Sequence, residues 1–437
     1  MKKNPTFFGL LVCFCAIGLF AACSSDVQGF GNSINVVNVS AKELLAPVYG
    51  KQDSAAIKAA TGANDFAFRL SAALVKNAGN GNFVCSPYSA WIPLAALVNA
   101  TDAQNKTALL TALGASGITE ADINRASSRM LYNLTDFQSR KDKGYYNPLK
   151  IANAIFVGKN VTLKKDFAQT FMDYYRGSSI NVNFSSRDAV DAVNRWASEN
   201  TNGLIKNVIQ EFDPMTVAAI ANAIYFSDRW SWEFDPRQTK DGVFHAPGLD
   251  TTASFMLREG DGQAYYEDSK VQAMPLSFYH GGGLYIILPK TGGAVQLLSS
   301  MTNSYFSEIQ RGSVQATGKL LLPRFSIEST IDDLSKSLVA LGVPLFDKEA
   351  APLTGGLIEE PLSVFLSDAV QKAAIKVDEK GTTAAAVTVM AGATSAGPPE
   401  PAKPFEMICD KPFVFILYAY TYDGGSQILF TGIVNQP

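Results

Sequence analysis

Residues 379–400 read EKGTTAAAVTVMAGATSAGPPE, and between Gly381 and Pro399 this stretch carries no charge. A solvated linker usually contains Ser, Gln, Lys or Glu, whereas small Ala and Thr with β-branched Val are also accepted inside a β-sheet. Over residues 382–390, strand alternation places only Thr, Ala and Met on one face and only Thr, Ala and Val on the other, so neither face forbids burial. Composition alone favours a flexible alanine-rich loop without a role, and the rest of the chain decides between these interpretations.

The segments on either side of this stretch predict strands of a large sheet. Thr216–Phe226 and Leu284–Leu288 are nearly continuous apolar runs, which is typical of strands covered on both faces. Nearer the C-terminus, Phe413–Tyr420 and Ile428–Val434 predict two strands around the turn Asp423-Gly424. We therefore expect one domain built on a large central sheet.

Helical patterns occur between these strands. Phe66, Leu70 and Leu74 recur every four residues and predict one buried stripe of a helix. A second helix is expected to begin at Ser86 and Pro87, because Ser can cap the free amides and Pro needs no donor at the first helical position. Helices and strands without regular alternation give the class α+β.

Few residues are suited to catalysis. His245 and His280 are the only histidines, and they lie where a strand end and a hairpin turn are expected. The chain has no H-E-x-x-H, G-x-S-x-G, P-loop, G-x-G-x-x-G or C-x-x-C motif. The formal net charge is -3, without a Lys/Arg-rich patch. We expect no enzyme activity, no metal or other cofactor, and no nucleic-acid partner.

The N-terminus has the pattern of an export signal. Lys2 and Lys3 precede an apolar run from Phe7 to Ala22. This run is shorter than the ~20 residues that a helix needs to cross the bilayer core. We therefore expect residues 1–22 to be a signal peptide that is removed.

The end of this signal resembles the bacterial lipobox, in which a cysteine is acylated and becomes the new N-terminus. The residues that carry the resemblance are Leu19–Cys23 (LFAAC). We expect Cys23 to carry lipid and residues 23–62 to tether a domain at 63–437. The alternative is a plain signal peptide that is cut nearby.

Two thiols are expected in the folded domain. Cys13 and Cys15 leave with the signal and Cys23 carries lipid, so Cys85 and Cys409 remain. They can form one disulfide, but two buried thiols are favoured.

The uncharged stretch and its flanks resemble the serpin family. In that family the hinge before the loop has an acidic residue, then Gly, Thr and three small residues. The corresponding residues are Glu379, Lys380, Gly381, Thr382, Thr383, Ala384, Ala385 and Ala386. Further stretches match the family in its order along the chain, from about residue 63 to Pro437. They are Asn82–Ser89 (NFVCSPYS), Asn222–Phe226 (NAIYF) followed by Trp230 and Phe234, Leu322–Phe325 (LPRF) and Lys411–Phe413 (KPF).

This resemblance implies the serpin fold, with a large central mixed β-sheet, further sheets, about nine helices and an exposed reactive loop at about residues 379–404. It also implies inhibition as a suicide substrate: a serine or cysteine protease attacks the loop, forms an acyl-enzyme, and is trapped when the cut loop inserts into the central sheet. Counted as in the family, the cleaved bond is Ser395-Ala396. Small residues there favour elastase-like or subtilisin-like targets.

The resemblance also implies residues that control sheet opening. Trp230 matches the aromatic residue that packs where the loop first enters the sheet, and Ser86, Ser89 and Asn222 match a polar cluster beneath the sheet. At Gln371 the family often has histidine, and an amide can replace it as donor and acceptor. Core packing and helix capping are the alternative roles of Trp230 and Ser86.

The implied partner is a target protease, bound covalently by a monomeric inhibitor that its lipid holds on a membrane. In this interpretation the chain is an exported bacterial outer-membrane lipoprotein that faces the periplasm or the cell surface. The alternative is a non-inhibitory serpin-fold surface lipoprotein with a binding, adhesion or chaperone role. The hinge of such a protein would typically carry charged or bulky residues.

Overall fold

A computed structural model of the chain describes residues 7–17, 53–136, 149–382, 404–421 and 425–437. Within these ranges the chain forms nine α-helices and fifteen strands, which confirms the α+β class. The helices are α1 (Ser54–Val75), α2 (Pro87–Leu97), α3 (Ala103–Ala112), α4 (Glu120–Leu131), α5 (Lys165–Tyr175), α6 (Arg187–Asn200), α7 (Ala294–Ser300), α8 (Asn303–Gly312) and α9 (Leu334–Ala340). The strands are β1 (Phe7–Ile17), β2 (Phe83–Cys85), β3 (Leu149–Gly158), β4 (Gly177–Val182), β5 (Ala218–Phe226), β6 (Lys240–Ala246), β7 (Leu249–Glu267), β8 (Val271–Ser277), β9 (Gly283–Pro289), β10 (Val314–Pro323), β11 (Phe325–Ile331), β12 (Ser363–Val377), β13 (Phe405–Ile408), β14 (Phe413–Tyr420) and β15 (Ser426–Val434).

Helix α1 begins earlier than its apolar stripe indicates. The Asp53 carboxylate accepts hydrogen bonds from two backbone amides of the first turn, each at 3.1 Å. This cap starts the helix at Ser54, so the domain boundary expected at residue 63 lies inside α1. The periodic pattern missed the first turns because their buried residues, Ala56, Ala59 and Ala63, are small and form no stripe of large apolar side chains.

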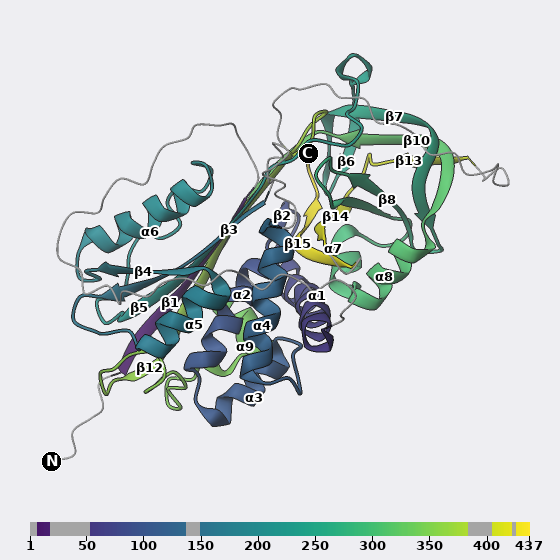
Figure 1. Ribbon diagram of the computed structural model, residues 1–437. Coiled ribbons are helices and arrows are strands. Elements are labelled where there is room, and N and C mark those ends of the chain that lie inside the picture. The colour runs from purple at the N-terminus through teal and green to yellow at the C-terminus, as the bar shows by residue number, and fades with distance from the viewer. Residues whose placement is uncertain (1–6, 18–52, 137–148, 383–403, 422–424) are drawn as a thin grey trace.

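The central sheet has six strands in the order β11-β12-β1-β5-β3-β4. It is mixed, because β11/β12 and β3/β5 are antiparallel pairs whereas β3/β4 is parallel. Every residue of β5 is buried, which confirms the prediction of a strand covered on both faces. In Figure 1, helix α6 covers one face of this sheet and α2 lies against the other.

Strand β1 fills the position between β12 and β5. It pairs parallel with both, from Phe7 opposite Ser363 to Ile17 opposite Tyr225. Therefore β5 and β12 run in the same direction on either side of it. The sequence FFGLLVCFCAI is the uninterrupted apolar run that a strand in the middle of a covered sheet requires. Removal of the predicted signal, residues 1–22, takes this strand out of the centre of the sheet.

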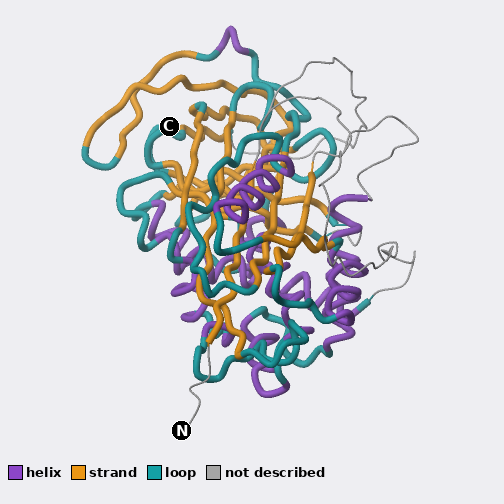
Figure 2. Tube along the Cα trace, turned by 90° about the vertical axis from the view of Figure 1, so that its left-hand side faces the viewer, coloured by secondary structure: helices purple, strands orange, loops and turns teal. Residues whose placement is uncertain are grey.

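The second sheet follows the order β13-β10-β7-β8-β9-β14-β15-β2, with β6 paired to β7. The predicted strands near the C-terminus form the antiparallel pair β14/β15. Figure 2 shows most helices gathered toward one end of the molecule, with strands of the second sheet reaching the other end.

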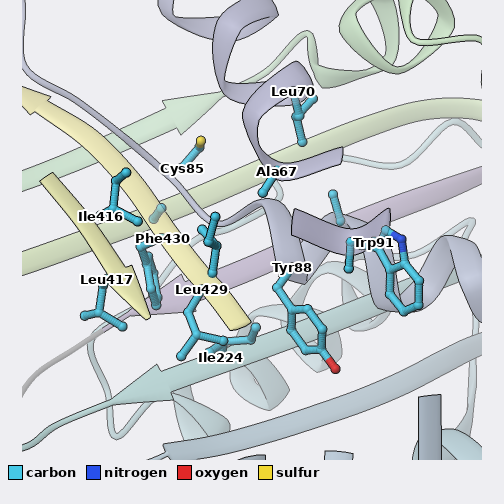
Figure 3. Close-up of a cluster of buried hydrophobic side chains, with 14 of the residues drawn as sticks. Ala67, Leu70, Cys85, Tyr88, Trp91, Ile224, Ile416, Leu417, Leu429 and Phe430 are labelled. Carbon is cyan, nitrogen blue, oxygen red and sulfur yellow. The ribbon is translucent and has the colours of Figure 1, made fainter. Parts of the chain in front are cut away.

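An apolar core joins the two sheets around α2 (Figure 3). Tyr88 and Trp91 of α2 belong to the same buried cluster as Ile224 of β5, Ile416 of β14 and Phe430 of β15, and none of these side chains is more than 1% exposed. The Trp91 indole N–H donates to a backbone carbonyl at 3.0 Å, so its polar atom is satisfied within the core. Strand β5 of the central sheet thus shares one core with α2 and the second sheet.

Candidate functional site

The chain after β12 turns sharply in a hinge, Asp378–Thr382. Gly381 forms isolated bridges with Asp378 and with Arg229, which follows β5. It has φ +150°, and a Cβ there would lie 2.2 Å from the carbonyl oxygen of Asp228. Only glycine fits so close an approach. The end of β12 is thereby held against the residues that follow β5.

Trp230 forms a platform beneath the hinge. Its indole N–H donates to the carbonyl oxygen of Asp378 at 2.9 Å, and its backbone N–H donates to that of Lys380 at 2.9 Å. The indole is 1% exposed and stacks on Phe278, with ring centroids 4.7 Å apart and 8° between the planes. The Trp230 side chain therefore packs in the core and contacts the hinge at the same time.

Glu379 holds the hinge to the neighbouring strands through an ion pair. Arg324, between β10 and β11, donates from Nε to both carboxylate oxygens at 2.8 and 2.9 Å, and the Thr239 hydroxyl donates at 2.5 Å. Burial acts to raise the pKa of Glu379, but the hydrogen bonds from Arg324 and Thr239 prevail and hold this pKa below its usual value. The Glu379 side chain is 7% exposed and that of Arg324 is 47% exposed, so water reaches the pair from the arginine side.

Thr382 is bound to Asp228, beyond the end of β5. Its backbone N–H donates to the Asp228 carbonyl oxygen at 3.0 Å, and its hydroxyl lies 3.3 Å from the backbone N and O of Asp228. The buried Asp228 carboxylate accepts the backbone N–H of His280 at 2.9 Å and lies 2.8 Å from His280 Nδ1. Sequence reasoning missed this pair. His280 does lie in a turn, but its partner is 52 residues away, and no local pattern joins them.

A second group of predicted residues forms a buried polar cluster between α2 and the central sheet. Gln371 accepts the backbone N–H of Ser86 at 2.9 Å and donates to the Ser86 carbonyl oxygen at 2.8 Å. Ser89 donates from its hydroxyl to the Asn222 side-chain oxygen. All four residues are fully buried. Gln371 therefore uses its amide as donor and acceptor at once.

The expected cap at Ser86 is wrong. Helix α2 does start at Pro87, but Ser86 makes no side-chain capping bond. Its hydroxyl instead donates to the carbonyl oxygen of Leu429 at 2.8 Å. A buried hydroxyl has to find a partner, and a carbonyl of β15 supplies one that the local sequence could not indicate.

The structure thus separates the predicted residues into the hinge group with Trp230, at the end of β12, and the polar cluster, at its middle. The other predicted site residues lie outside the described residues. They are Thr383, Ala384, Ala385, Ala386, Ser395, Ala396 and Cys23.

Among the residues that the structure describes, the other reactive side chains do not form a site. Cys85 and Cys409 are free and buried rather than paired. Burial raises the pKa of Cys85 to about 11 and also raises that of Cys409. His245 makes an exposed pair with Asp250 at 3.0 Å. In the described parts of the chain, no group of His, Cys, Asp and Glu is arranged to hold a metal ion, and no helix is long and apolar enough to span a membrane.

Comparison with known proteins extends these observations to most of the chain. A family model described as "Serpin (serine protease inhibitor)" matches residues 61–437. Alpha-1-antitrypsin 1-4 of Mus musculus is 28% identical over 391 residues, which cover 88% of this chain and 91% of the mouse protein. Antichymotrypsin-2 of Bombyx mori is 30% identical over 382 residues, 86% of this chain and 97% of the other. The crystal structure of human thyroxine-binding globulin matches with a TM-score of 0.74 at 24% identity, over 88% of this chain and 100% of that one.

Proposed function

Because the chain belongs to the serpin family, we propose that it is a monomeric suicide-substrate inhibitor of serine proteases, with cysteine proteases as a second target class. The observation that carries the proposal is the parallel pair β5 and β12. These strands flank a position that accepts a whole further strand, and the hinge, Asp378–Thr382, follows β12 and bridges to Arg229 beyond the end of β5. Because β5 and β12 are parallel to each other, a chain that turns back after β12 and enters between them is antiparallel to both.

The proposed reaction begins as ordinary proteolysis. The protease serine oxygen attacks the carbonyl carbon of Ser395, and the C–N bond to Ala396 breaks. The protease histidine gives a proton to the departing amine, and Ser395 remains bound to the enzyme as an ester. In a normal substrate, water then hydrolyses this ester. Inhibition requires the cut loop to move first.

The hinge determines where the cut loop goes. A chain that turns back after Thr382 enters between β12 and β5 and satisfies its backbone groups on both edges. The native state before cleavage then holds free energy that insertion releases. Small, uncharged side chains over 382–386 enter without burying an ion or a bulky group. In the full chain β1 occupies this position, so the proposal requires that β1 leave with the signal or be displaced.

The proposed targets have shallow specificity pockets, as in elastase-like or subtilisin-like enzymes. The residues on either side of the proposed bond, 393–396, are all small, and none is Lys or Arg.

Incubation with proteases tests this proposal. The chain is exported from a bacterial host, purified after mass analysis shows that residues 1–22 are absent, and mixed with neutrophil-type elastase or subtilisin. We expect a complex that resists denaturing electrophoresis and a C-terminal fragment that begins at Ala396. Clean cleavage without a complex, across a panel of proteases, would instead support a non-inhibitory binding role. Human thyroxine-binding globulin, whose structure contains a bound ligand, is an example of the same fold.

We further propose that lipid on Cys23 holds the exported chain on an outer membrane. Support comes from the LFAAC sequence and from the start of α1 at Ser54, which leaves residues 23–52 to connect the lipid to the domain. Cells fed labelled palmitate should label the wild-type chain and not Cys23→Ala. Equal labelling of both would contradict a lipid at this cysteine.

A further inference from the structure

A cavity of about 390 Å³ lies in the second sheet, apart from the hinge contacts. It forms where β7 stops pairing with β10 and begins to pair with β8, three strands that lie together in Figure 1. Residues that follow the hinge platform, Ser231 and Trp232, close one side. This volume is in the range of cavities that hold small organic molecules. We call it the Arg258 pocket.

Arg258 gives the pocket a positive charge without a matching acid. Its guanidinium donates to the Trp232 carbonyl oxygen and lies over the Phe234 ring, 4.4 Å from the centroid. Within the described residues no carboxylate forms an ion pair with it. Burial lowers the pKa of Arg258 to about 10, so the side chain is still a cation at neutral pH. A cation that is partly withdrawn from water is stabilised by an anion that bonds to its remaining N–H groups.

Gln263 lines the same pocket and has one unsatisfied acceptor. Its Nε2 donates to the carbonyl oxygens of Gly260 and Gly318 at 3.0 and 2.8 Å, which fixes the amide orientation across an irregularity in the β7/β10 pairing. Its Oε1 is buried and has no hydrogen-bond partner among the described residues. A buried acceptor without a donor costs free energy. A ligand N–H or O–H group would supply the donor once the atoms that cover Oε1 move aside.

The other walls suit an apolar group. Met274 and Pro275 of β8 line the pocket, and the Met274 side chain is buried. Trp232 lines it as well, yet the Trp232 side chain is 62% exposed, so solvent reaches the pocket beside an indole face. Thioether and indole groups both pack well against aromatic rings.

We propose that the Arg258 pocket binds a small organic carboxylate that has an aromatic or apolar body and one hydrogen-bond donor, as an N-acylated amino acid does. The carboxylate pairs with Arg258, the donor reaches Gln263 Oε1, and the ring packs between Trp232 and Met274. No residue of this pocket takes part in the proposed trapping of a protease, so either proposal can fail alone.

N-acetyl-L-phenylalanine, which has all three groups, is the probe. The full-length chain is labelled at its methionine methyl groups, the Met274 signal is identified by its loss in Met274→Leu, and the probe is titrated. We expect a saturable shift at Met274 with a dissociation constant on the order of 1 mM or lower. The uncharged N-acetyl-L-phenylalaninamide should bind roughly tenfold more weakly, because it cannot pair as an anion with Arg258.

Two variants sharpen this experiment. Arg258→Gln should weaken acid binding by about tenfold, whereas Arg187→Gln, at an arginine that is 73% exposed on α6, should leave it unchanged. If Arg258→Gln does not fold, the acid and amide pair on the unaltered chain still decides the question. Equal affinity for acid and amide, or no saturable shift of the Met274 methyl, overturns the proposal.

Discussion

The hinge and the buried polar cluster contact the same strand, β12, but different kinds of bond hold them. At the hinge, Glu379 and Thr382 are bound by groups at the ends of strands, and the Arg324 partner is half exposed. In the cluster, Gln371 and Asn222 lie within strands, and both are fully buried. Water can replace the Arg324–Glu379 bond at the hinge, whereas it does not reach the cluster.

This difference indicates which step each region controls. A hinge bond that water can replace requires little free energy to break, so the hinge can release the loop while the fold persists. Separating α2 from β12 leaves buried amide groups unsatisfied, at about 1–3 kcal/mol each. Substitutions at the hinge should therefore change the outcome of protease attack, and substitutions in the cluster should change the free energy of unfolding.

The largest effect is expected from Thr382→Arg. Position 382 is 1% exposed, and the Asp228 carboxylate beside it is already bonded to His280. A guanidinium drawn into the sheet with the loop would be a buried ion, which costs several kcal/mol. We expect the chain to become a substrate, with the yield of covalent protease complex lower by roughly tenfold or more, as measured by denaturing electrophoresis.

Thr382→Ser is the matched control, because it keeps the hydroxyl that lies 3.3 Å from the Asp228 backbone. It should inhibit like the unaltered chain. If Thr382→Arg formed as much covalent complex as the unaltered chain, the insertion mechanism would be contradicted. Loss of the folded state in that variant, followed by circular dichroism, would show that the hinge is part of the core and that the two regions do not differ.

The next effect is expected in the cluster, from Gln371→Met. Methionine is close to glutamine in size but leaves the Ser86 N–H and carbonyl groups without their partner. The loss of stability should be about 2–6 kcal/mol, from two buried groups at about 1–3 kcal/mol each, measured by urea unfolding. Gln371→His, which retains one donor and one acceptor, should lose less. A loss as small as that of an exposed substitution would contradict the assignment of this cluster to folding stability.

Much of the fold could be predicted from the sequence, because the patterns that indicate its strands lie within short stretches of the chain. The apolar run of β5 and the strands β14 and β15 were recognised from uninterrupted apolar residues, and Gly381 from its place before a run of small residues. The resemblance to serpins then ordered these elements into one fold, which the family match over residues 61–437 confirms.

What could not be predicted depends on partners far apart in the chain. Ser86 has the sequence context of a cap, but its hydroxyl bonds to a carbonyl of β15. The pair of Asp228 and His280 has no motif, since a turn and a strand end meet only after folding. The run 7–17 fits both a signal and a covered strand, because both require unbroken apolar residues.

A smaller effect than that of Gln371→Met is expected from Asp228→Ala, at a residue outside the hinge that binds Thr382. It removes the acceptor of the His280 backbone N–H and should lower stability by about 1–3 kcal/mol. Because Lys380 is exposed, trypsin cleavage after it reports release of the hinge and should become faster. Asp228→Asn should lose less, since one amide oxygen still accepts that N–H. An unchanged cleavage rate in Asp228→Ala would show that the carboxylate does not hold the hinge.

The smallest effect is expected from Arg324→Met. The pair with Glu379 is exposed on the arginine side and should contribute about 1 kcal/mol. The folded-state pKa of Glu379 is lowered, so this stabilisation is present above the unfolded value of about 4.3 and is lost as pH falls through the lower folded value. The difference in unfolding free energy between the unaltered chain and Arg324→Met should therefore be largest near neutral pH and shrink in acid, as urea unfolding at several pH values would show. Glu379→Gln should abolish this dependence, because an amide does not titrate. A difference that stayed constant with pH would mean that Arg324 holds the hinge by packing rather than by charge, and the hinge would then resemble the cluster in kind.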